Sequence, residues 1–87
     1  MTAPPKRIAR LLADMRQNSV GVRFADAMTV AEHFFGKPRR AGGSHHVFKM
    51  PWAGDPRINL QQSGKYAKAY QVRQLLEAVE RLGIDDA

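Results

Sequence analysis

Apolar residues recur at helical spacing in three segments of the chain. The first segment predicts a helix over about residues 6–17 from an i, i+3, i+4, i+7 pattern: Ile8, Leu11, Leu12 and Met15. A stronger stripe predicts a second helix, which Gly36 and Pro38 end: Phe24, Ala27, Met28, Ala31, Phe34 and Phe35. A third stripe predicts a helix over about residues 68–82: Val72, Leu75, Leu76, Val79 and Leu82.

The middle of the chain changes to the two-residue period of β-strands. The stretch RINLQ (57–61) alternates between two faces, with Ile58 and Leu60 on one and Arg57, Asn59 and Gln61 on the other. A second strand is expected over about residues 45–50, and the sequence PWAGDP between the two strands is suited to a hairpin loop. Residues 37–40 could add an edge strand, although Pro38 limits its hydrogen bonding, and Gly64 ends the strand region.

The resulting order of elements is helix, helix, two or three antiparallel strands, helix. It predicts an α+β fold in which the helices cover one face of a small sheet, while the other face stays open to water. With 87 residues the chain has room for one compact domain. We expect a leader and extra helix over residues 1–21, the domain proper over 22–83 and an acidic tail over 84–87.

Charge is concentrated in the strand region. The chain has a net charge of +6, and residues 37–73 hold eight basic residues and a single acidic one. Such a region is expected for a protein that binds a polyanion, most often nucleic acid, although a solvated basic surface has the same composition. The chain has no cysteine, which excludes disulfides and thiolate zinc sites. No apolar run could span a bilayer and the start lacks a signal peptide, so a cytoplasmic protein with no membrane partner is the default expectation.

The adjacent His45 and His46 are the clearest candidates for chemistry. At the start of a strand their side chains project to opposite sides, so at most one shares the open face. A histidine can take the proton from an RNA 2′-hydroxyl near neutral pH, and the alkoxide then attacks the neighbouring phosphate. Nearby lysines and arginines would stabilise the developing charge, and the preceding Gly-Gly-Ser leaves room for a backbone to approach. The alternative is a pair of half-exposed histidines with no catalytic role.

Other chemistry is less well supported. A metal site is not expected, because His33 lies on a separate helix and no carboxylate flanks the histidine pair in sequence. The chain has no phosphate-binding loop and no nucleophile elbow. Trp52, Tyr66 and Tyr70 could stack on bases or simply pack on the core.

The motif GGSHHVFKM, followed by an alternating strand and a helix after a lysine-rich turn, resembles the HicA family of toxins. That family carries a Gly-Ser-His signature, here Gly43, Ser44 and His45, in a fold related to the double-stranded-RNA-binding domain. The stretches PWAGDPRINLQ and AYQVRQLLEAVERL resemble a HicA-like subgroup with a tryptophan in the hairpin loop. The similarity covers about residues 23–82, with an α-β-β-β-α core, and leaves the first helix without a counterpart.

The resemblance implies a metal-independent mRNA endoribonuclease without cofactor, the toxin of a toxin–antitoxin pair. It also implies a HicB-like antitoxin that covers the histidine and the basic surface. The catalytic histidine of the family falls on His45, with Gly43 shaping the backbone and Ser44 placing a hydroxyl near the phosphate. We expect the RNA contacts to come from these residues: Gly43, Ser44, His46, Lys49, Arg57, Lys65 and Lys68.

Several alternatives stay open from the sequence. A non-catalytic RNA-binding module of the same fold would bind RNA with strong salt dependence and leave it uncut. A DNA-binding helix pair is disfavoured, because the positive charge lies on the strand region instead of the first two helices. The extra helix could cap the core, contact a second copy or bind the antitoxin, and the sequence does not give the oligomeric state.

Overall fold

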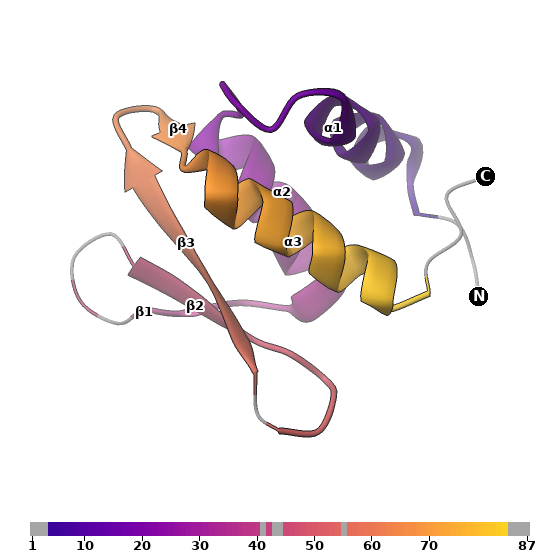
Figure 1. Ribbon diagram of the computed structural model, residues 1–87, viewed down its shortest axis with the longest axis vertical. Coiled ribbons are helices and arrows are strands. Elements are labelled where there is room, and N and C mark those ends of the chain that lie inside the picture. Colours follow the sequence, from indigo (N-terminus) through magenta and orange to yellow (C-terminus); the bar gives the residue numbers. More distant parts are fainter. Residues whose placement is uncertain (1–3, 41, 43–44, 55, 84–87) are drawn as a thin grey trace.

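The structure, a computed structural model, describes residues 4–40, 42, 45–54 and 56–83. Within these residues the elements follow in the order α1 (Lys6–Gln17), α2 (Phe24–Phe35), β1 (Arg39–Arg40), β2 (His45–Lys49), β3 (Arg57–Ser63), β4 (Tyr66–Ala67) and α3 (Ala69–Arg81). The helices gather on one side of the sheet (Figure 1). The predicted α+β class is therefore confirmed.

The helix bounds follow the predicted apolar stripes closely. Helix α1 spans the predicted residues and buries Ile8, Leu12 and Met15. Helix α2 ends at Phe35, and Gly36 follows it with a φ of 79°, in the left-handed region that only glycine adopts at little cost. Helix α3 begins one residue later and ends one residue earlier than the pattern predicts.

The strands form one antiparallel sheet in the order β1-β2-β3-β4. The long β2–β3 pairing runs from His45 opposite Gln61 to Lys49 opposite Arg57. Strand β1 at the edge has only two residues, and it begins directly after Pro38, which has no backbone N–H to contribute.

The prediction that Gly64 ends the strand region is wrong, because strand β4 follows it at Tyr66–Ala67. Gly64, with φ at 61°, allows the chain to turn back after β3 so that Ser63 pairs with Tyr66. The other edge of β4 binds the segment before α2, where the Ala67 N–H donates to the Val22 carbonyl at 2.9 Å. A two-residue strand shows no alternation, so periodicity could not reveal it.

The core lies between the sheet and the helices. Helices α2 and α3 pack on the sheet, and α1 packs on those two helices. The side chains of Phe48 and Leu60 on the strands meet Val30, Val72 and Leu75 from the helices, and all five are essentially inaccessible to water. The apolar stripe of α1 belongs to the same hydrophobic cluster. Among the described residues, no helix is both long and apolar enough to cross a membrane.

Candidate active site

The face of the sheet that points away from the helices carries the candidate chemistry. Alternation along the two long strands directs six side chains to this open face: His45, Val47 and Lys49 from β2, and Arg57, Asn59 and Gln61 from β3. Arg39 of β1 lies opposite Val47 and extends the same face by one strand. The predicted open, polar face therefore exists, and it is defined here by these seven residues.

His45 contacts one partner on this face through a short polar interaction. Its Nδ1 lies 2.9 Å from Nδ2 of Asn59, one strand away. The contact uses Nδ1 and leaves Nε2 as the ring nitrogen that can meet a substrate. The ring is half-buried, so it is both held in place and accessible.

The other end of the Asn59 carboxamide is less well satisfied. Its Oδ1 is buried and has no hydrogen-bond partner within the described part of the chain. Leaving a buried acceptor unpaired costs about 1–3 kcal/mol, so such atoms often mark a functional arrangement.

Cations line a shallow hollow on the open face. Lys37, Arg39, Lys49 and Arg57 surround the apolar floor provided by Val47. All four cationic side chains are exposed, and β1, β2 and β3 contain no carboxylate. Four exposed cations gathered in one hollow give a surface that attracts phosphate groups.

The second histidine lies on the opposite face. His46 pairs with Leu60 in the β2–β3 register, on the side that faces the helices. Its ring packs at a tilt against Phe24 of α2, with 5.3 Å between the ring centroids. The two histidines therefore point to opposite sides, as the alternation predicts, and the open face receives His45.

The remaining expected RNA contacts fall in two places. Lys65 lies in the β3–β4 turn with its Nζ 5.6 Å from the centre of the Tyr66 ring, and Lys68 immediately precedes α3. Both Tyr66 and Tyr70 are exposed in this region. Gly43 and Ser44 lie outside the described residues. Gln61 is the β3 residue opposite His45. Arg57 precedes Gln61 at the start of β3 and Lys65 follows it in the β3–β4 turn, so cations lie on both sides of this position.

Gln71 is a buried polar residue that the sequence argument missed. Its Oε1 accepts a hydrogen bond from the backbone N–H of Gln61 at 2.7 Å, and its Nε2 donates to the Tyr70 hydroxyl at 3.2 Å. This bond ties the first turn of α3 to β3 at the residue opposite His45. A signal was present, because Gln71 precedes Leu75 by four residues and so lies on the apolar stripe of the helix.

Trp52 acts as an anchor for the loop between β2 and β3. Its half-buried ring meets Phe35 edge-on at 6.4 Å, and the Arg81 guanidinium lies 4.6 Å from its centre. The sequence left two roles open for Trp52, stacking on a base or packing on the core, and these contacts support packing.

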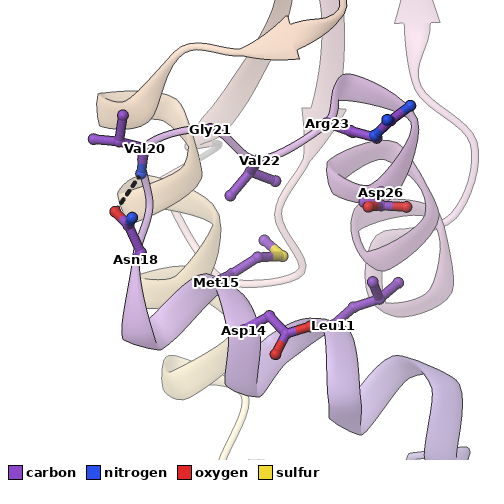
Figure 2. Close-up of a pocket in the computed structure, with 9 residues that line it drawn as sticks. All are labelled: Leu11, Asp14, Met15, Asn18, Val20, Gly21, Val22, Arg23 and Asp26. Carbon is purple, nitrogen blue, oxygen red and sulfur yellow. Dashed lines mark hydrogen bonds between the residues drawn. The ribbon is translucent and has the colours of Figure 1, made fainter.

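A second hollow lies between α1 and α2, on the far side of the helices from β2. Figure 2 shows its lining, which includes Asp14 and Asp26 from neighbouring helices and an exposed turn held by a hydrogen bond from the Val20 N–H to Asn18 Oδ1. It contains carboxylates without a base or a cluster of cations, so it is less suited to RNA chemistry than the open face. Among the described residues, no group of three or more histidine, aspartate and glutamate side chains could hold a metal ion.

Comparison with protein-family models, with curated proteins and with solved structures finds no significant match to this chain.

Proposed function

We propose that this chain is a metal-independent endoribonuclease that cleaves mRNA, a HicA-type toxin with His45 as the general base. The observation that carries the proposal is the position of His45. Its ring lies on the open face, its Nδ1 contacts Asn59, and the same face carries Arg39, Lys49 and Arg57. RNA cleavage through the 2′-hydroxyl needs a base and cations that bind phosphate, and the open face carries both.

The chemistry follows from these residues. Nε2 of His45 takes the proton from a ribose 2′-hydroxyl, and the oxygen attacks the adjacent phosphorus. The bond from phosphorus to the 5′ oxygen breaks, which leaves a 2′,3′-cyclic phosphate on one product and a 5′-hydroxyl on the other. Lys49 and Arg57 lie four residues along the β2–β3 pairing from His45 and Gln61, about 13 Å at the rise of a strand, so in this proposal they bind phosphates that flank the cleaved one.

The leaving 5′ oxygen needs a proton from a second donor. His46 is poorly placed for this role, because its ring packs against Phe24 on the opposite side of the sheet. A lysine or a water molecule on the open face is the better donor in this proposal.

The arrangement of elements is consistent with the family resemblance. Without α1 and the short β4, the order is α2-β1-β2-β3-α3 with both helices on one face, which fits a core related to the double-stranded-RNA-binding domain. In the sequence, Gly43 and Ser44 of the signature come directly before β2, and His45 is the first residue of that strand. An mRNA substrate would place the protein in the cytoplasm, and a HicB-like antitoxin would inhibit it by covering the open face.

The experiment is cleavage of a labelled mRNA by purified protein in the presence of EDTA. Wild type is expected to cleave, and His45→Ala to lose at least about 10²-fold in rate, the lower end of what a general base contributes. His33→Ala is the matched control, since His33 is exposed on α2 and packs edge-on against Phe34. A folded His45→Ala protein with full activity would refute the mechanism. Salt-dependent RNA binding without cleavage by wild type would favour the non-catalytic RNA-binding module.

A further inference from the structure

The partner of His45 decides what the histidine can do. Asn59 is held rigidly, because Ile58 and Leu60 on either side of it are buried in the core. Its carboxamide reaches Nδ1 of His45 at 2.9 Å, and its Oδ1 is buried without a partner in the described structure.

Two arrangements of this contact differ by half a turn of the amide. The two ends of a carboxamide are close in size, so either end reaches Nδ1 at the same separation. If the amide nitrogen donates to Nδ1, the neutral ring carries its proton on Nε2. If the amide oxygen accepts from Nδ1–H, Nε2 holds the lone pair. Only the second arrangement lets Nε2 take a proton from a substrate.

The catalytic cycle separates the two arrangements further. A histidine that has taken a proton is an imidazolium, and both of its ring nitrogens are then donors. An amide N–H directed at Nδ1 would face a second donor at that moment, and the contact would break. The amide oxygen accepts from Nδ1–H in both the neutral and the charged ring, so this contact survives the whole cycle.

We infer that Asn59 is a positioning residue for His45, and that its Oδ1 accepts a hydrogen bond from Nδ1–H so that Nε2 stays available as the base. The inference rests on the proposed role of His45 in cleavage. It also makes a statement about the free protein, because the position of the proton on the neutral ring can be measured without RNA.

The direct test is nitrogen NMR of the histidine rings in ¹⁵N-labelled protein, at a pH where the rings are neutral. Wild type is expected to show His45 with its proton on Nδ1. In Asn59→Leu the acceptor is gone, and we expect the proton to move to Nε2, the form that free histidine favours. Gln62→Leu is the matched control, since it replaces an exposed amide on the same strand and is expected to leave the His45 signals unchanged.

Kinetics provide the second readout. Asn59→Leu is expected to lower kcat about ten- to a hundredfold, less than removal of the base itself, with little change in KM. Asn59→Asp keeps an acceptor at Nδ1 and adds a negative charge that favours the imidazolium. Because the base must be neutral, the acid limb of the pH–rate profile should move to higher pH in Asn59→Asp.

The pH comparison depends on the charges that surround His45. Those on the neighbouring strands and turn are cationic or titratable side chains: Arg39 and Arg40 on β1, His46 and Lys49 on β2, Arg57 on β3, Lys65 in the β3–β4 turn and Tyr66 on β4. The helices pack against the other face. An aspartate at position 59 would therefore be the first carboxylate on β1, β2 or β3, which makes its effect on the profile easy to attribute.

The outcomes keep the two proposals apart. Wild-type protein with the His45 proton on Nε2 overturns the role of Asn59, even if His45→Ala abolishes cleavage. An unchanged tautomer and rate in a folded Asn59→Leu protein overturn it as well. If Nδ1 carries the proton in wild type and Asn59→Leu moves it, the positioning role stands. Full cleavage by His45→Ala would in that case refute only the proposed function.

Discussion

The two faces of the β2–β3 pair differ in almost every property, although alternate residues of the same two strands supply them. The face toward the helices presents His46, Phe48, Ile58 and Leu60, three of which belong to the buried hydrophobic core. The open face presents cations, amides and His45 around a single apolar residue, Val47. Stability and chemistry are therefore separated by one position along the strand, and substitutions should affect one without the other.

The largest expected effect separates the two histidines. His45→Ala should abolish mRNA cleavage, a loss of at least about 10²-fold, and should lower the free energy of unfolding by no more than about 1–3 kcal/mol, because it removes the hydrogen-bond partner of Asn59. His46→Ala should retain cleavage and lose some stability, because its ring packs on Phe24. The measurements are product formation and urea unfolding of both variants. Equal losses of cleavage in the two variants would break the comparison between the faces.

The next effect compares neighbouring strand residues in stability. Phe48→Ala should lower the free energy of unfolding by about 3–5 kcal/mol, since it opens a cavity among fully buried side chains. Val47→Ala, on the open face, should cost about 1 kcal/mol or less. The midpoints of urea unfolding measure both effects. Similar midpoints in the two variants would contradict the difference in burial between Phe48 and Val47.

A smaller effect tests the bond between the helix layer and the strand opposite His45. Gln71→Leu removes the acceptor of the Gln61 N–H and should cost about 1–3 kcal/mol. Gln74→Leu, at an exposed position of the same helix, is the control and should change stability by about 0.5 kcal/mol or less. Hydrogen exchange of the Gln61 amide should also become faster in Gln71→Leu. Unchanged exchange would contradict the hydrogen bond.

The smallest expected effect concerns the cations of the open face. Lys49→Gln should weaken RNA binding severalfold for all sequences alike and reduce the salt dependence of the logarithm of affinity by about one unit of slope. Lys6→Gln removes a charge from α1, which packs on α2 and α3 and not on the open face, and should leave the slope unchanged. Fluorescence anisotropy with labelled RNA at several salt concentrations measures both. A change of slope in Lys6→Gln instead would place the RNA on the helices.

Much of this fold follows from periodicity. The apolar stripes predicted three helices to within a residue or two, because each stripe is long and ends in a breaker such as Gly36. The RINLQ alternation predicted which β3 residues face the core, and Ile58 and Leu60 are indeed buried. The two-residue β4 escaped, because pairing with Val22 and Ser63 defines it instead of any local pattern.

The candidate site was predictable only in part. Adjacent positions on a strand required His45 and His46 to diverge, but they did not say which one faces the core. That choice depends on the register in which His46 meets Leu60, a contact between distant parts of the chain. The contact between His45 and Asn59 depends on the same register, so composition and spacing could place Asn59 on the open face without identifying its partner.

Trp52 has a practical consequence, since it is the only tryptophan in the chain. Its ring carries the hairpin loop against Phe35 at the end of α2 and Arg81 at the end of α3, and it lines the same hollow as Arg57. Tryptophan fluorescence, excited selectively over the two tyrosines, therefore comes from a single known site at the cationic end of the sheet. A change in that emission would report ligand arrival or loop release in real time, without a label on either molecule.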